Sequence, residues 1–73
     1  MNRNDKLTIH MEYTLNAIKR GVKVRTSGLS IYRTDTGAAV TSTIAALRLR
    51  GLVELQMVGD ERIFVLTEKG KNA

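Results

Sequence analysis

The sequence predicts one small α+β domain, built from three helices and a two- or three-stranded antiparallel ribbon. Apolar residues recur every three or four positions in two segments, and each of these segments ends at a glycine. Two runs rich in strand-forming residues follow the second glycine and flank a Gly-Asp pair. Because 73 residues can bury a single core, we expect one domain over residues 1–73, with frayed ends at 1–4 and 71–73.

The first predicted helix begins at Asn4 or Asp5, either of which can cap its first turn. Basic residues suit the negative C-terminal end of this helix, and Gly21 stops it. An apolar stripe at helical spacing predicts the side that packs on the core. The stripe consists of Leu7, Met11, Leu15 and Ile18.

The segment after Gly21 is expected to hold a short strand and then a second helix. Residues 22–25 alternate apolar and basic side chains, which predicts a strand that can join the later ribbon. Thr26 or Ser27 is then expected to cap a short helix that runs to about Arg33. A turn at residues 34–36 separates this helix from the next one.

The third predicted helix begins at Asp35 or Thr36 and ends at Gly51. Its buried side follows from spacings of four and three residues. The residues on that side are Val40, Ile44 and Leu47.

A β-hairpin is predicted after the third helix. Its strands are residues 52–58 and 62–66, and its tip is Gly59-Asp60 or Asp60-Glu61. A last helix followed by a two-stranded ribbon is typical of a winged helix-turn-helix, in which that helix is the recognition helix and the ribbon is the wing. The fold class we predict is therefore α+β, with a winged helix-turn-helix arrangement.

The second half of the chain resembles a known group of proteins. Residues 40–54 read VTSTIAALRLRGLVE, residues 60–66 read DERIFVL and residues 66–70 read LTEKG. This pattern is similar to the third helix, the wing and the following segment of bacterial winged-helix regulators of the multiple-antibiotic-resistance (MarR-like) group. The resemblance covers roughly residues 24–70. It implies a DNA-binding transcription regulator, and the single helix before the core unit is similar to minimal regulators of phages, plasmids and archaea.

The charge of the chain favours a polyanionic partner. Twelve Lys and Arg residues against seven Asp and Glu residues give a formal net charge of +5. We expect double-stranded DNA as the partner, with solvated surface charge as the alternative explanation.

Several function classes find no support in the sequence. No nucleophile–base pair, paired carboxylates or phosphate-binding glycine loop is present, so we expect no enzyme. Without cysteine and with one histidine, the chain offers few metal ligands, and we expect neither a metal nor a cofactor. No apolar run can cross a bilayer and no signal-peptide pattern opens the chain. We expect a cytoplasmic protein of a prokaryotic cell or of an infected host cell.

The winged-helix resemblance implies which residues meet DNA. The outer side of the third helix would enter the major groove, and basic residues around it would hold phosphates. The predicted base or groove contacts are Thr36, Thr41, Ser42, Ala45 and Arg48. The predicted phosphate contacts are Arg25, Ser27, Arg33 and Arg62.

A second hypothesis stays open for the same surface. The outer side of the third helix carries small residues and few long donors, and Leu49 adds an apolar side chain near its centre. These features also suit a protein-interaction module that acts as an adaptor, inhibitor or assembly factor.

Apolar residues on other predicted surfaces favour a homodimer, because a small domain gains stability from association and paired half-sites suit a two-fold symmetric protein. The candidate dimer or partner residues are Ile9, Tyr13, Leu49, Ile63 and Val65.

Overall fold

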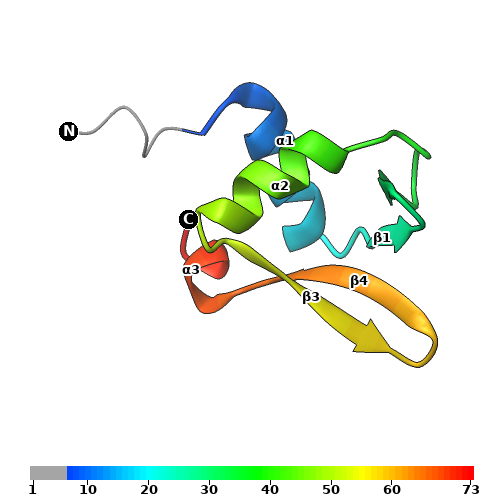
Figure 1. The fold of residues 1–73 in the computed structure, drawn as a ribbon. Helices are drawn as coiled ribbons and strands as arrows, with labels where there is room; N and C mark the ends of the chain where they lie inside the picture. Colours follow the sequence, from blue (N-terminus) through cyan, green and yellow to red (C-terminus); the bar gives the residue numbers. More distant parts are fainter. Residues whose placement is uncertain (1–6) are drawn as a thin grey trace.

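The computed structural model describes residues 7–73 and is an α+β domain with three helices and one four-stranded antiparallel sheet across these residues. The strands lie in the order β2-β1-β4-β3, and α1 and α2 pack together on one face of the sheet (Figure 1). The elements in chain order are α1 (Ile9–Lys19), β1 (Val24–Ser27), β2 (Ser30–Arg33), α2 (Thr41–Leu49), β3 (Val53–Val58), β4 (Glu61–Leu66) and α3 (Glu68–Lys71).

Helix α1 begins later than the sequence predicted. The expected caps, Asn4 and Asp5, lie outside the described residues, and the helix begins at Ile9 behind Thr8. The Thr8 hydroxyl oxygen accepts a hydrogen bond from the Met11 N–H at 3.2 Å, which satisfies one of the free donors of the first turn. The predicted apolar stripe is confirmed, because its members are either buried or packed against the core.

The predicted second helix is wrong: the chain forms a β-hairpin there. β1 pairs with β2 from Val24↔Arg33 to Ser27↔Ser30, which leaves a two-residue loop. The first loop residue, Gly28, has a φ of 60°, whereas no non-glycine residue described has a positive φ. Glycine at the first loop position is typical of a type II′ turn, whose twist matches that of paired strands. The sheet therefore has four strands, where the sequence predicted a ribbon of two or three.

Helix α2 is the predicted third helix in a shortened form. It begins at Thr41 instead of Asp35 or Thr36, because the residues before it lie along β2. Ala39 bridges to Tyr32, and the Val40 N–H donates to the Ile31 carbonyl at 2.8 Å.

The end of α2 agrees with the prediction. Gly51 follows the helix with a φ of 74°, a conformation that a glycine adopts without steric cost.

The second hairpin has the predicted tip. β3 and β4 pair from Val53↔Leu66 to Val58↔Glu61, so the loop is Gly59-Asp60. Figure 1 shows this ribbon extending beyond the helices.

The short helix α3 follows β4 and packs on the end of the sheet. Lys71, expected to fray with the two residues after it, is the last residue of α3. The Ala73 carbonyl accepts a hydrogen bond from the Lys19 side chain, which connects the end of the chain to α1.

The core lies between the two longer helices and one face of the sheet. Val24 and Phe64 are paired neighbours in the sheet and are both buried, against Ile44 and Leu47 of α2. We call the face that carries Val24 and Phe64 the inner face and the opposite one the outer face. Among the described residues, no helix is long and apolar enough to span a membrane.

Candidate functional site

The exposed side of α2 carries most of the predicted groove contacts. Ile44 and Leu47 are fully buried and mark the side of the helix that faces the core. The exposed residues on α2 are Thr41, Ser42, Ala45, Arg48 and Leu49. The sequence periodicity therefore predicted the exposed side of this helix correctly.

The hydroxyl groups of two predicted groove residues already form hydrogen bonds within the fold. Thr36 lies in the turn before α2 and not on it, and its hydroxyl oxygen accepts from the Ala38 N–H at 3.2 Å. The Thr41 hydroxyl accepts from the Ile31 N–H at 3.1 Å and lies 3.4 Å from the Ile31 carbonyl, to which it donates. Thr41 therefore fastens α2 to β2, and its hydroxyl has little remaining capacity for a ligand.

The surroundings of α2 favour a negatively charged ligand. No acidic residue occurs between Asp35 and Glu54, whereas Arg48 and Arg50 lie within this stretch. The first turn of α2 contains no acidic residue, and Val40, before it, provides no capping side chain. The amide groups at this positive end of the helix are thus without a side-chain acceptor.

The predicted phosphate contacts are divided between different parts of the molecule. Arg25 pairs with Ile63 next to the buried Val24–Phe64 pair, so its side chain lies on the outer face by strand alternation. Its guanidinium is 3.5 Å from the Glu61 carboxylate. Ser27 is exposed at the end of β1.

Arg33 is held by a neighbouring carboxylate. Its Nε and Nη2 donate to the two carboxylate oxygens of Asp35 at 3.0 and 2.7 Å. These hydrogen bonds lower the pKa of Asp35 below its usual value of 3.8. A phosphate would have to compete with Asp35 for this guanidinium.

Arg62 differs from the other two predicted arginines. It lies two residues before Phe64 on β4, so its side chain is on the inner face, the same side as α2. Within residues 7–73, neither Arg62 nor Arg48 is in an ion pair with a carboxylate. These two guanidinium groups lie on the α2 side and are available to a ligand.

A groove of about 600 Å³ runs between α2 and the inner face of the sheet. We call it the α2 groove; it is lined by Ile31, Ile44, Ala45, Arg48, Leu49 and Phe64. Leu49 is 91% exposed at its edge, although it is one of the largest apolar side chains on the helix. The walls of the groove are apolar apart from the arginine.

The apolar surface continues from the groove along the β3–β4 ribbon. Leu55 pairs with Phe64 and Met57 pairs with Arg62, so both side chains are on the inner face. They are 40% and 59% exposed, because the ribbon extends past the helices.

Leu55 and Met57 belong to this surface and were not among the site residues predicted from the sequence. The alternation of apolar residues at positions 53, 55 and 57 was the available signal. Alternation identifies one side of a strand, but it does not show where the covering helix ends.

The candidate dimer residues fall into two groups. Ile9 and Tyr13 are each 64% exposed on the same side of α1. Ile63 and Val65 are half-buried and lie in the lining of a second hollow, of about 620 Å³, to which no residue of α2 contributes. They do not form one surface with Leu49.

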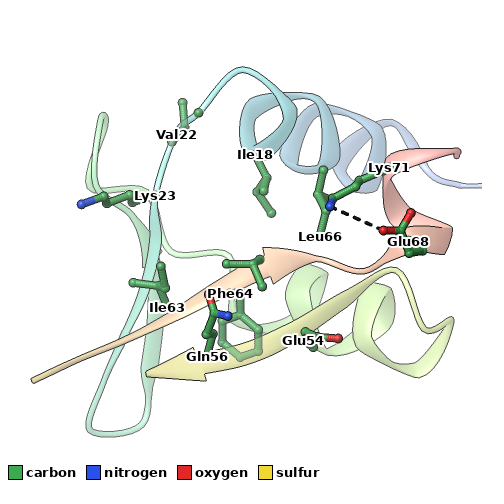
Figure 2. Close-up of a pocket in the computed structure, with 12 residues that line it drawn as sticks. Ile18, Val22, Lys23, Glu54, Gln56, Ile63, Phe64, Leu66, Glu68 and Lys71 are labelled. Carbon is green, nitrogen blue, oxygen red and sulfur yellow. Dashed lines mark ion pairs between the residues drawn. The ribbon is translucent and has the colours of Figure 1, made fainter. Parts of the chain in front are cut away.

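Figure 2 shows this second hollow, which lies between the end of α1, the segment before β1, strands β3 and β4, and α3. Ile18 points from α1 toward β4, whereas Lys23 points away from the hollow. Glu68 and Lys71 are 3.8 Å apart on one side and neutralise each other there. The hollow has none of the net positive charge found beside α2.

Residues 7–73 contain no group of three or more His, Asp or Glu side chains placed to share a metal ion. Comparisons of this chain with models of protein families, with curated proteins and with solved structures found no match.

Proposed function

We propose that this protein binds double-stranded DNA and acts as a small transcription regulator of the winged-helix type. The observation that carries the proposal is the exposed side of α2, which has three short side chains, one arginine, one leucine and no carboxylate. A helix with such a side can approach the floor of the major groove closely. The sequence resemblance to minimal MarR-like regulators supports the same function.

Three exposed residues of α2 and one arginine of the ribbon would have distinct parts in this complex. Ser42 can donate to or accept from a base edge or a phosphate, and Ala45 can contact a thymine methyl group. Arg48 would contact a guanine or a phosphate, and Arg62 would contact a phosphate from the ribbon. The carboxylate pairs of Arg25 and Arg33 give these two residues a smaller part in binding.

The proposed form is a homodimer in which α1 provides the contact. Ile9 and Tyr13 expose apolar surface on α1, and their burial against a second copy would leave the exposed side of α2 open. Two copies would then present two helices to paired half-sites.

A salt titration of DNA affinity tests the proposal. We expect Arg48→Gln and Arg62→Gln each to weaken binding to a random-sequence duplex and to reduce the slope of log K against log salt by about one. Arg20→Gln is the matched control, because it removes the same charge from the end of α1. The proposal is wrong if all three variants lose affinity equally, or if the wild-type protein does not bind duplex DNA.

A second candidate function is a protein-interaction module that uses the same helix. The 91% exposure of Leu49 favours it, because a large apolar side chain gains most from contact with another protein. Leu49→Ser separates the two functions: it should leave the salt-dependent DNA affinity unchanged and weaken binding of a protein partner.

A further inference from the structure

We infer that the α2 groove binds a protein segment in which apolar side chains are combined with carboxylates, such as one face of an acidic amphipathic helix. This inference gives the second candidate function a ligand of defined chemistry and rests on that function. It does not depend on whether the protein binds DNA.

The apolar walls of the groove carry the first part of the argument. Ile31 and Phe64 form its floor on the sheet, and Leu49 stands at its edge, 91% exposed. Leu55 and Met57 extend the same apolar surface along the ribbon. Phosphates and base edges are polar and would leave most of this surface without a matching contact, whereas leucine-like side chains would remove it from water.

The size and shape of the groove indicate a helix as the ligand. About 600 Å³ can accept a few large side chains but not a folded domain. One wall is a helix and the other is a sheet, an arrangement that accepts an amphipathic helix through anchors three or four residues apart. Both walls belong to the core-packed part of the molecule, because Ile44 and Phe64 are buried core residues. Little conformational entropy would therefore be lost from the protein on binding.

The charges around the groove select carboxylates on the ligand. Arg48 lines the groove, and Arg62 lies on the inner face opposite Met57. Within the described part of the chain, neither is paired with an acidic residue, and no acidic residue lines the groove. A carboxylate next to apolar walls forms a stronger, bidentate pair with arginine than it does in open water.

The same arginines connect this inference to the proposed function. If Arg48 contacts DNA, an acidic segment in the groove must displace the DNA, and the two ligands are mutually exclusive. An acidic partner would then act as an inhibitor of DNA binding.

Three synthetic peptides test the inference by fluorescence anisotropy on the full chain. All three carry leucines at spacings of three and four residues, and their intervening positions are filled with Glu, Gln or Lys. We expect the Glu peptide to bind at least about tenfold more tightly than the Gln peptide, and the Lys peptide to bind most weakly. Equal binding of the Glu and Gln peptides would overturn the inference.

Variants of the protein locate the binding site. Leu49→Ser keeps the net charge and leaves the core unchanged, since Leu49 is exposed. It should lower the affinity for the Glu peptide about tenfold. Arg48→Gln should lower this affinity by a similar factor, whereas Arg20→Gln, at a residue outside the groove, should change it little. If Leu49→Ser binds like wild type, or if Arg20→Gln loses as much as Arg48→Gln, the attraction is a general one between opposite charges and the groove is not the site. Loss of DNA binding alone would leave these peptide results unchanged, so the two proposals fail separately.

Discussion

Gly70 is the position where a single methyl group should damage the fold most. It lies in α3 and is buried, and a Cβ placed on it would be 2.0 Å from the Leu52 carbonyl oxygen. That oxygen accepts a hydrogen bond from the Thr67 N–H at 3.0 Å, and the Thr67 hydroxyl accepts from the Gly70 N–H at 3.1 Å. The close approach of α3 to the chain before β3 therefore requires a residue without a side chain.

The expected cost of Gly70→Ala follows from these contacts. The chain must move by at least 1 Å to restore the 3.0 Å separation that Cβ atoms keep from their neighbours. Overpacking of this kind costs about 1–3 kcal/mol, and loss of the Leu52–Thr67 hydrogen bond adds about 1 kcal/mol. Replacing a helical glycine by alanine returns about 0.5–1 kcal/mol. We expect a net loss of about 2 kcal/mol, which is a decrease in Tm of roughly 8–16 °C in a domain of this size.

Thermal unfolding followed by circular dichroism measures this change. Lys69→Ala is the matched control, because Lys69 is in the same helix and exposed; its Tm should stay close to that of wild type. If Gly70→Ala has a Tm equal to or above that of wild type, α3 does not pack against Leu52 as described.

Three further changes test other parts of the fold. Gly28→Ala should destabilise the protein by at least about 1 kcal/mol, because the residue has a φ of 60° in a hairpin loop; a helix at this position would instead gain stability from alanine. Ile44→Ala should cost about 2–5 kcal/mol in urea unfolding, because Ile44 is fully buried, and a cost below 1 kcal/mol would contradict its place in the core. Asp35→Asn should lower the Tm at neutral pH, because the pKa of Asp35 is depressed by Arg33 in the folded protein. The stabilisation that the Asp35 carboxylate provides is present above its unfolded-state pKa near 3.8 and is lost as the pH falls through its lower folded-state pKa. The Tm values of wild type and Asp35→Asn should therefore converge in acid. A difference in Tm that does not change with pH would refute the pairing of Asp35 with Arg33.

The second half of the fold was predictable from sequence because its local patterns agree with its tertiary packing. The spacing of Ile44 and Leu47 marks a buried helix side, and Gly51 and Gly59 mark a helix stop and a hairpin tip. Each of these patterns has one low-energy local structure, and the observed sheet and core accept it.

The segment between Ser27 and Arg33 was not predictable in the same way. Ser27 and the preceding Thr26 are equally suited to a helix cap and to a turn, and Gly28 permits both a helix start and a type II′ loop. Pairing of β1 with β4 decides between them, and this contact joins Val24 to Phe64, forty residues along the chain. Local sequence does not contain that information.

The candidate site was predictable only as far as single elements are concerned. Helical periodicity placed Ser42, Ala45 and Arg48 on one exposed side, as the structure does. The groove beside them depends on how α2 packs against β2 and β4, and the division of Arg25 and Arg62 between two faces depends on strand register. Both are properties of the assembled sheet.

The central claim is that the exposed side of α2 and the inner face of the β3–β4 ribbon form one ligand-binding surface. Amide chemical shifts measured by NMR during titration with a duplex DNA test this claim most directly. We predict that the largest changes occur at Ser42, Ala45 and Arg48 and at Arg62 on the ribbon. The claim is contradicted if the largest shift changes occur instead at Ile63 and the other residues around the second hollow, while the shifts of α2 do not change.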